Sequence, residues 1–193
     1  MKDRVLITGA SSGLGKHLVE KFVSEGHEVL SHNGRKHYNL TRMDDVARLA
    51  QAALDEEVKV LVNNAAIVCP NIMFPSYSVA QICDMIDVNL KAPIILTHLL
   101  LAELNNVINI NSMVGLEVKS PRTLYSATKW GLRGFSNSLK KENSDIKVLD
   151  VYPTNIETYP GRPHSMNIKM VVDQIYDSYA SGAQKLILDG RKL

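Results

Sequence analysis

A tyrosine and a lysine stand four residues apart in the segment Tyr125–Lys129, with the sequence YSATK. Residues four apart on a helix share one face, so the ammonium of Lys129 would lie near the phenol of Tyr125. A nearby positive charge lowers the pKa of a phenol from its ordinary value of about 10 and lets it act as a general acid or base. Both residue types are common in the chain, so chance remains the alternative for the spacing alone.

A second chemical signal is the glycine-rich stretch at residues 8–15, TGASSGLG, which follows a short apolar run and opens an amphipathic segment. Gly9 tolerates the backbone angles of a sharp turn. Gly13 would let backbone amides approach a pyrophosphate, and Gly15 would let the following helix pack closely. The helix N-terminus then offers N–H groups and a positive dipole end to phosphates. This context favours a dinucleotide site over a turn without a ligand.

The elements that must position these residues alternate along the chain. The expected strands are Val5–Ile7, Glu28–Ser31, a brief one near His37–Leu40, Val58–Val62, Val107–Ile110, Lys147–Val151 and Leu186–Leu188. The expected helices are Gly15–Glu25, Asp44–Leu54, Val79–Glu103 with a bend or seam at Pro93, Ser126–Lys140 and Ile168–Ala180. The pattern predicts an α/β fold with a doubly wound, Rossmann-like parallel sheet of about seven strands and helices on both faces. Ligands on such sheets bind at the carboxyl ends of the strands.

Composition narrows the class of protein. The length of 193 residues suits a single domain over residues 1–193, and 45% hydrophobic residues suit a globular core. A formal charge of +2 is too balanced to indicate nucleic acid or an anionic membrane as a partner. Cys69 and Cys83 lack metal-ligand spacing, so no metal site is expected and a reduced, cytoplasmic protein is favoured. The first residues leave no room for a signal peptide.

The glycine loop and the Tyr-x-x-x-Lys pair together resemble the short-chain dehydrogenase/reductase family, from Val5 to about Gly190. In that family the tyrosine and lysine are catalytic. The resemblance implies that Ser112, at the end of a strand, positions and polarises the substrate oxygen. It also implies that Asn89, in the sequence VNLK, helps hold a water-linked proton relay to Lys129. Taken alone, Ser112 would be interpreted as a turn or cap serine and Asn89 as a surface or kink residue.

The resemblance also implies a set of cofactor-binding residues. In the sequence NNAA at residues 63–66, Asn63 would tie neighbouring strands together, and Ala66 replaces a glycine of the family. Lys129 would hold the nicotinamide ribose. Thr158 is a further candidate for contact with a phosphate or the carboxamide. The implied cofactor-binding residues are Gly9, Ser11, Ser12, Gly13, Leu14, Gly15, Arg35, Asn39, Leu40, Asn64, Ala65, Tyr125, Lys129, Pro153 and Ile156.

The choice of cofactor depends on the end of the second strand. An acidic residue there would bind the adenosine ribose and favour NAD(H). Residues 31–36, SHNGRK, contain no carboxylate. Arg35 and Lys36 are able to meet a 2′-phosphate, Arg35 in bidentate fashion. NADP(H) is therefore favoured, with NAD(H) as the alternative. The other interpretation of Arg35 and Lys36 is that they are solvated surface cations with no part in binding.

The function that the resemblance implies is an NADP(H)-dependent oxidoreductase that interconverts a carbonyl and an alcohol by hydride transfer, with Tyr125 as general acid or base. One alternative is a non-enzymatic NAD(P)-binding sensor or regulatory protein on the same fold. Another is an isomerase or epimerase that retains its cofactor. The partner is a small-molecule carbonyl or alcohol, and the sequence offers no charged anchor for a thioester, steroid or sugar. The long helices resemble subunit contacts of the family and predict a homodimer or homotetramer.

Two departures from the family pattern affect the substrate end. Thr154 stands where the family has a glycine, and it restricts the turn after the sixth expected strand. The segment Thr158–Asn167 has only the length of a loop, which predicts an open or shallow substrate site. Candidate lining residues are Val68, Met73, Met113, Val114 and Tyr159.

Overall fold

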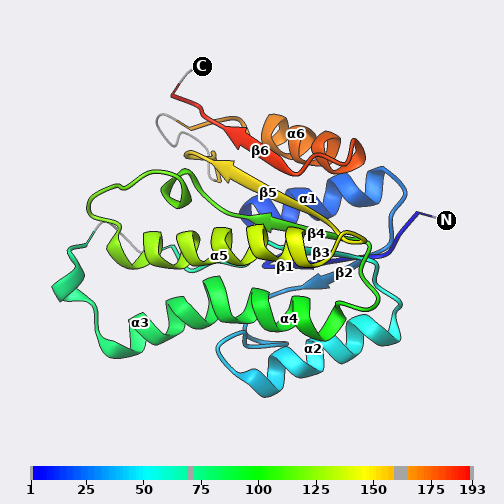
Figure 1. The fold of residues 1–193 in the computed structure, drawn as a ribbon, viewed down its shortest axis with the longest axis horizontal. Coiled ribbons are helices and arrows are strands. Elements are labelled where there is room, and N and C mark those ends of the chain that lie inside the picture. The colour runs from blue at the N-terminus through cyan, green and yellow to red at the C-terminus, as the bar shows by residue number, and fades with distance from the viewer. Residues whose placement is uncertain (1, 69–71, 159–164, 192–193) are drawn as a thin grey trace.

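The computed structural model describes residues 2–68, 72–158 and 165–191. At its centre is a six-stranded sheet in the order β2-β1-β3-β4-β5-β6, in which every neighbouring pair is parallel (Figure 1). The strands are β1 (Val5–Thr8), β2 (Val29–His32), β3 (Val60–Asn63), β4 (Asn106–Ile110), β5 (Lys147–Pro153) and β6 (Lys185–Leu188). The strand order reverses direction between β1 and β3, which is where doubly wound sheets bind their ligands. The predicted fold class is confirmed.

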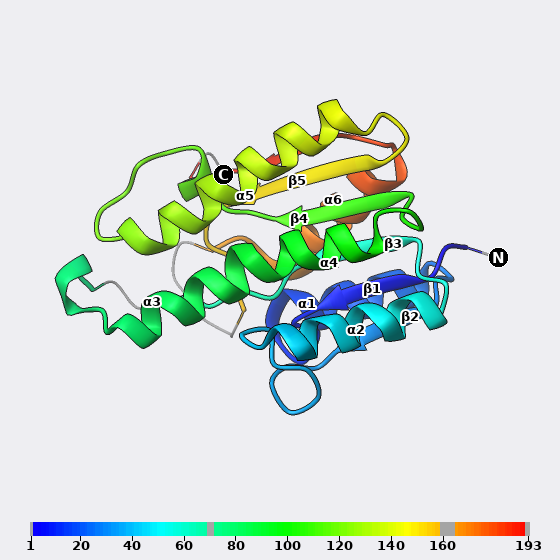
Figure 2. The ribbon, with the colours of Figure 1, turned by 60° about the horizontal axis from the view of Figure 1, so that its bottom comes forward.

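Helices cover both faces of the sheet (Figures 1 and 2). Val5 and Ile7 pack with residues of α1 and α6 on one face, and Leu6 packs with residues of α2 and α4 on the other. This alternation follows from the two-residue period of a strand, which is buried here on both sides. The helices are α1 (Gly13–Ser24), α2 (Met43–Asp55), α3 (Val79–Ile86), α4 (Ala92–Leu100), α5 (Thr123–Glu142) and α6 (Ile168–Ala180).

The brief strand predicted near His37–Leu40 does not form, so the sheet has six strands and not about seven. The chain turns after β2 at Gly34, whose φ is +85°. The backbone groups that a strand would need have other partners. The Tyr38 carbonyl accepts from the His32 ring, and the Asn39 amide donates to the Asp45 carboxylate at 2.9 Å.

The predicted helix Val79–Glu103 is divided into α3, a π-helical turn at Asp87–Lys91, and α4. The break therefore comes before Pro93, which lies in the first turn of α4. The π turn adds one residue to the helix locally, and such turns are frequent at functional sites.

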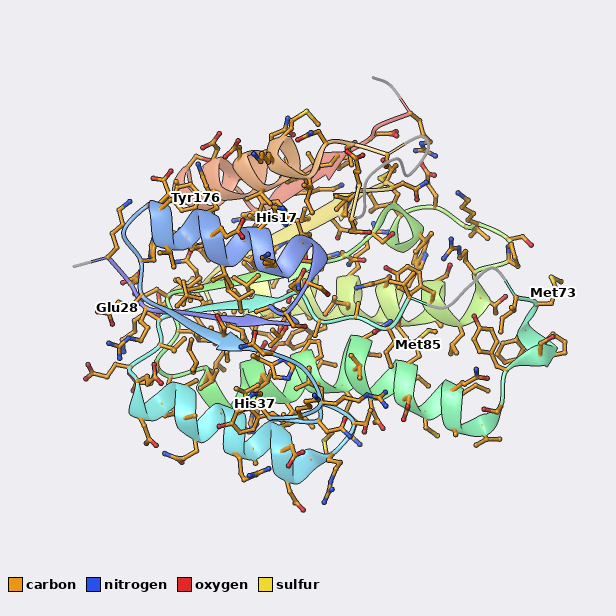
Figure 3. The ribbon with its side chains drawn as sticks, turned by 180° about the vertical axis from the view of Figure 1, so that it is seen from behind. His17, Glu28, His37, Met73, Met85 and Tyr176 are labelled. Atoms are coloured by element: carbon orange, nitrogen blue, oxygen red, sulfur yellow. The ribbon has the colours of Figure 1, made fainter. Side chains whose placement is uncertain are left out.

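Some of the residues named in the sequence analysis lie away from the sheet or outside the described structure. Met73, a candidate for the substrate site, is 63% exposed and lies at the outer end of the molecule, next to the 3₁₀ turn Phe74–Ser76 (Figure 3). Cys69 and Tyr159 lie outside the described residues. Of the helices that the structure describes, none combines the length and hydropathy needed to cross a bilayer.

Candidate active site

A cavity of about 720 Å³ lies at the carboxyl ends of the strands. Most of the predicted site residues line it, although they come from strand ends, loops and helices that belong to five different strand connections. Gly13 and Asn89 are not on its wall, and neither is Met73. Among the described residues, no group of three or more His, Cys, Asp and Glu side chains gathers as a metal site. The predicted site residues on the wall are Gly9, Ser11, Ser12, Leu14, Gly15, Arg35, Asn39, Leu40, Asn64, Ala65, Ser112, Tyr125, Lys129, Pro153 and Ile156.

The glycine loop between β1 and α1 needs its glycines for two physical reasons. Gly9 and Gly13 have φ angles of +67° and +53°, which residues other than glycine rarely adopt. A Cβ atom at Gly15 would overlap the carbonyl oxygen of Gly9 and approach the Asn64 amide nitrogen. Gly15 therefore lets α1 begin in close contact with the loop itself.

Polar side chains at the ends of β1 and β3 hold this loop in place. The Thr8 hydroxyl accepts from the N–H groups of Asn64 and Ala65, both at 3.0 Å. The Asn64 amide nitrogen donates to the carbonyls of Thr8 at 2.8 Å and Gly9 at 3.1 Å. Asn64 was predicted to contact the cofactor, but its amide nitrogen is occupied in fixing the loop. The strand tie expected of Asn63 is present, because its amide donates to Asn109 on β4 at 2.9 Å.

The structure adds His32, which sequence reasoning did not single out. This last residue of β2 lies on the cavity wall and is only 3% exposed. Its Nδ1 accepts from the Gly9 N–H at 3.1 Å, and its Nε2–H donates to the Tyr38 carbonyl at 2.8 Å. Because a backbone N–H can only donate, Nδ1 carries no proton and the ring is neutral. The sequence did place His32 at the end of the second strand, and in the structure it is paired in register with Thr8, directly before the glycine loop.

The His32 bridge predicts a pH dependence of dinucleotide binding. Burial lowers the pKa of His32, against an opposing effect of the Tyr38 carbonyl and with a smaller contribution from His37 in the same direction as burial. Below the ordinary histidine range of about 6.5, a proton on Nδ1 would face the Gly9 N–H and remove the bond that holds the loop. We therefore expect affinity for NADH to fall as the pH decreases below that range. The folded protein binds fewer protons there, so its stability decreases in the same direction.

The measurement is the dissociation constant of NADH between pH 5 and 8, followed by nicotinamide fluorescence. NADH is the better probe because it lacks the 2′-phosphate, which titrates near pH ~6 like other phosphate monoesters. His32→Gln keeps a donor and an acceptor but does not titrate, and it should flatten the profile. His37→Gln is the matched control. Identical profiles for the wild type and His32→Gln would contradict the prediction.

Ser112, Tyr125 and Lys129 meet at one part of the wall. Ser112 follows β4, and Tyr125 lies in the first turn of α5 with Lys129 one turn later. Lys129 is 2% exposed, its Nζ donates to the Ile110 carbonyl at 2.9 Å, and Nζ lies 5.6 Å from the centre of the Tyr125 ring. Burial lowers the pKa of Lys129 to about 8.

The pKa of Tyr125 is shifted opposite to the prediction. Burial raises it, and the hydrogen bond with Ser112 and the charge of Arg122 offset this only in part. Lys129 was expected to lower the pKa of this phenol. Its ammonium instead lies over the face of the ring and donates to the Ile110 carbonyl, so it does not offset the burial of the phenol.

Asn89 is buried behind the cavity wall, in the π-helical turn, and is 1% exposed. Its Oδ1 accepts from the Ile67 N–H at 2.7 Å, and its Nδ2 donates to the Ile67 carbonyl at 2.9 Å. The same amide approaches the Thr128 hydroxyl at 3.4 Å. Asn89 thus positions the loop after β3, whose Ile67 and Val68 line the cavity.

The predicted adenosine end of the cavity contains Arg35 and Asn39. Arg35 is exposed and pairs with Asp84 of α3 at 3.1 Å. The Asn39 carbonyl oxygen accepts from the backbone and hydroxyl of Thr41, at 3.1 and 3.0 Å. Lys36 does not line the cavity. Of the two cations proposed for a 2′-phosphate, Arg35 is therefore the one on the wall.

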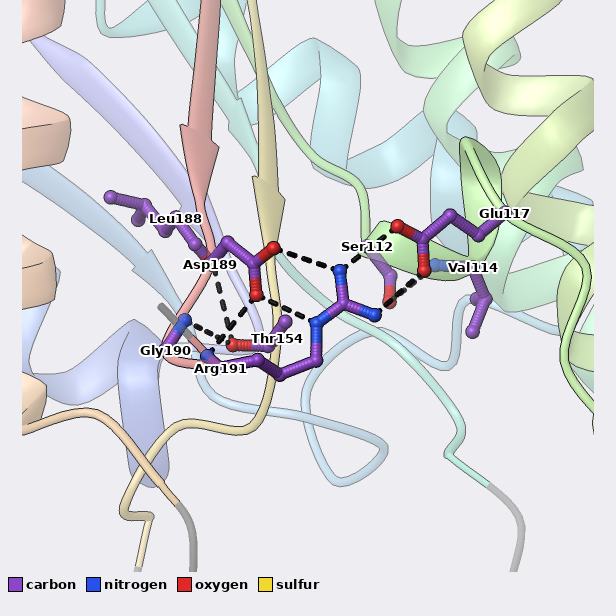
Figure 4. Close-up of polar contacts among 8 residues, drawn as sticks. All are labelled: Ser112, Val114, Glu117, Thr154, Leu188, Asp189, Gly190 and Arg191. Atoms are coloured by element: carbon purple, nitrogen blue, oxygen red, sulfur yellow. Dashed lines mark hydrogen bonds and ion pairs between the residues drawn. The ribbon is translucent and has the colours of Figure 1, made fainter. Parts of the chain in front are cut away.

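The ends of β5 and β6 are tied together at the opposite end of the site (Figure 4). The Thr154 hydroxyl accepts from the Gly190 N–H at 2.9 Å and donates to the Leu188 carbonyl at 3.3 Å. Threonine in place of the family glycine therefore supplies a cross-strand tie. Arg191 binds both carboxylate oxygens of Glu117, at 2.8 and 2.9 Å, and also both oxygens of Asp189. This ion-pair cluster joins the end of β6 to the segment between Ser112 and α5.

The doubly wound sheet, with a glycine loop and a Ser, Tyr and Lys group at one edge, defines a dinucleotide-dependent type of site. The model of the family described as short chain dehydrogenase matches residues 36–166, and the chain belongs to that family. Two curated relatives are the NADP-dependent 3-hydroxy acid dehydrogenase YdfG of Salmonella typhi and the serine 3-dehydrogenase of Agrobacterium fabrum. The first is 31% identical over 77% of this chain and 71% of its own length; the second is 28% identical over 82% and 74%.

Solved structures share the fold. The bulky-bulky ketone specific alcohol dehydrogenase from Comamonas testosteroni has a TM-score of 0.86 and 24% identity, over 96% of this chain and 86% of that one. A short-chain dehydrogenase from Sphingobium yanoikuyae, in complex with NADPH, has a TM-score of 0.83 and 24% identity, over 96% and 87%.

Proposed function

We propose that this protein is an NADP(H)-dependent oxidoreductase that interconverts a carbonyl compound and an alcohol by hydride transfer. One observation carries the proposal: Ser112, Tyr125 and Lys129 line the same cavity as the glycine loop. A proton donor and a dinucleotide cradle in one cavity are what such a reaction requires.

The residues present fit a dinucleotide. Gly9 and Gly15 let the loop pack closely on itself and on the residues after β3, and the loop leads into a helix N-terminus suited to phosphates. Arg35 on the wall and the lack of a carboxylate at the end of β2 support NADP(H), with NAD(H) as the alternative. The NADP dependence in the name of the Salmonella relative supports the same choice.

Each side chain then has a role. When bound, the nicotinamide supplies or accepts the hydride, which no side chain can do. In the direction of reduction, the Tyr125 hydroxyl gives its proton to the developing alkoxide oxygen, and the Ser112 hydroxyl donates a hydrogen bond to that same oxygen. Lys129 lies beside the Tyr125 ring on the cavity wall and, as the family resemblance implies, holds the nicotinamide ribose. Asn89 keeps the loop after β3 in position and, as the family resemblance implies, helps hold the water-linked proton relay to Lys129.

The test of the cofactor assignment is the binding of NADPH and NADH to wild type and Arg35→Ala. We expect Arg35 to leave Asp84 for a 2′-phosphate, because a phosphate offers it more charge and bidentate oxygens. The substitution should weaken NADPH binding by about tenfold, the order of one charge-assisted hydrogen bond, and leave NADH binding unchanged. Lys36→Ala is the neighbouring control. Equal losses for both nucleotides would contradict the role of Arg35.

The same preparation distinguishes the enzyme from the non-enzymatic sensor. Oxidation of NADPH on addition of a carbonyl compound supports the enzyme. Tight NADPH binding without turnover of aldehydes, ketones and oxo acids would favour a sensor.

A homodimer or homotetramer stays a prediction. It is supported by large apolar side chains that remain exposed on two helices, Leu99 on α4 and Trp130 on α5, at 42% and 44%. A cytoplasmic location likewise stays a prediction.

A further inference from the structure

Asn111 connects the two segments that carry the residues of the proposed reaction. It directly follows β4 and directly precedes Ser112, and it is 2% exposed on the cavity wall. We propose that Asn111 is a positioning residue, whose side-chain amide holds Ser112 and α5 at a fixed separation so that Ser112 and Tyr125 meet the same substrate oxygen. The inference rests on the proposed function, because it concerns the alignment of two groups that this function requires.

Both ends of the Asn111 amide are hydrogen-bonded, one to each of these segments. Its Oδ1 accepts from the Ser112 N–H at 2.9 Å, and its Nδ2 donates to the backbone carbonyl of Lys129 at 3.2 Å. The backbone N–H of Asn111 donates to the Val151 carbonyl on β5 at 2.8 Å, which fixes the base of the side chain in the sheet. A single planar amide therefore joins the sheet, the serine and the helix.

Lys129 is held by the end of β4 at two points. Its ammonium donates to the Ile110 carbonyl at 2.9 Å, and its own carbonyl accepts from Asn111, the next residue along the chain. Tyr125 lies one turn earlier on the same helix, so it moves with Lys129. Apolar packing tolerates small sliding movements that directional hydrogen bonds do not. A displacement of α5 along β4 would move Tyr125 relative to Ser112, and an error of about 1 Å in such an alignment can lower a rate by about 100-fold.

The packing around this amide is close. A Cβ atom at Gly115 would lie 2.5 Å from Oδ1 of Asn111 and 3.2 Å from the carbonyl oxygen of Lys129. Gly115 belongs to the 3₁₀ turn Met113–Gly115, a conformation that other residues also adopt, so space is the reason that glycine is needed here. The end of β4, this turn and α5 therefore converge on the Asn111 amide.

A second asparagine on the same face of β4 allows positioning to be separated from stability. Asn109 lies two residues earlier, and its Nδ2 donates to the hydroxyl of Ser136 on α5 at 2.9 Å. Asn109 and Ser136 are both 0% exposed, and neither is among the described residues that line the cavity. Asn109 thus also attaches α5 to β4, about two helical turns beyond Lys129. Its replacement should reduce stability without displacing Ser112.

The experiment compares Asn111→Ala with Asn109→Ala, the same substitution in the same strand region. Turnover is measured as the oxidation of NADPH with 2,3-butanedione, a small reactive diketone. We expect Asn111→Ala to lower kcat by about 10- to 100-fold, and to change KM and the dissociation constant of NADPH by less than about twofold. Asn109→Ala should keep kcat within about twofold of wild type, even where urea unfolding shows an equal or larger loss of stability.

Hydrogen exchange of the protein without cofactor gives a second measurement, which does not depend on turnover. The Ser112 N–H loses its acceptor in Asn111→Ala, so its exchange should accelerate by about tenfold or more beyond the change in global stability. In Asn109→Ala, the exchange of the same N–H should follow the global stability alone.

Gly115→Ala tests the same amide from its other side. The new Cβ atom would displace the amide without removing it, so kcat should fall in the wild-type background. In the Asn111→Ala background the amide is absent, and the same substitution should have a much smaller effect on kcat. Independent, additive losses would show that the two residues do not act through one contact.

The outcomes separate this inference from the proposed function. A kcat in Asn111→Ala equal to that in Asn109→Ala, or unchanged exchange of the Ser112 N–H, would overturn the positioning role even if the wild type binds and oxidises NADPH. A wild type that binds no NADPH, or that oxidises none with a range of carbonyl compounds, would instead contradict the proposed function. The exchange of the Ser112 N–H would then decide alone whether Asn111 fixes this segment.

Discussion

Phenylalanine at position 125 is expected to lower the rate of carbonyl reduction by about 10²- to 10⁴-fold, the range of a lost general acid. The substitution removes the phenolic oxygen and keeps the ring, so the ring contact with Lys129 should persist. The measurement is kcat/KM for NADPH oxidation, together with the dissociation constant of NADPH, which should change little. Tyr152→Phe, which removes a tyrosine hydroxyl away from the cavity, is the control. Retention of activity in Tyr125→Phe would remove Tyr125 from the chemistry.

The direction of the Tyr125 pKa shift gives this prediction a pH dependence. Burial raises the pKa of the phenol, so the protonated form needed for reduction is present throughout the neutral range. The reverse reaction needs the ionised form as a base, so its rate should rise as the pH increases toward the raised pKa. The rate of alcohol oxidation at pH 7, 8 and 9 tests this, and a rate that falls over that range would contradict it.

Replacing Lys140 with methionine should have the largest effect on stability, a loss of about 3–5 kcal/mol in the free energy of unfolding, because it leaves a buried charge without its partner. Asp150, on β5, is 1% exposed, and its Oδ2 lies 2.7 Å from the Lys140 ammonium. Its other oxygen, Oδ1, has no hydrogen-bond partner among the described residues. Lys140 also donates to the Gln184 carbonyl at 2.9 Å.

Urea unfolding of the two neighbouring lysine variants gives the measurement. Lys141→Met changes an exposed lysine one position away and should alter the free energy by less than about 0.5 kcal/mol. A double variant with Lys140→Met and Asp150→Leu should recover most of the loss, since it removes both charges. Equal unfolding curves for the two single variants would show that the Lys140–Asp150 pair does not stabilise the fold.

Local patterns predicted the elements whose stability is local or fully buried. The helix Ile168–Ala180 has the predicted bounds, and the apolar runs at β1, β3, β4 and β5 form central strands. The glycine loop and the Tyr125–Lys129 pair were visible because backbone angles and helical spacing restrict the residue types allowed. These are constraints that one segment carries by itself.

Contacts between segments far apart in the sequence could not be predicted from local patterns. Arg191 is 74 residues from Glu117, and Arg35 is 49 residues from Asp84, and no local pattern relates either pair. The role of His32 depends on the approach of Gly9, which follows the neighbouring strand β1 and is 23 residues away in the sequence. The sign of the Tyr125 pKa shift depends on how deeply the phenol is buried, which spacing does not reveal.

Because the strand predicted near His37–Leu40 does not form, β2 lies at one edge of the sheet and β6 at the other. An open edge presents unpaired backbone groups on which another chain can add a strand, the first step toward aggregation. Both edges here have only four residues, β2 continues into the polar sequence NGRK, and β6 begins with Lys185. Short edges flanked by lysine and arginine resist intermolecular strand pairing, so the loss of a strand need not reduce colloidal stability at high protein concentration.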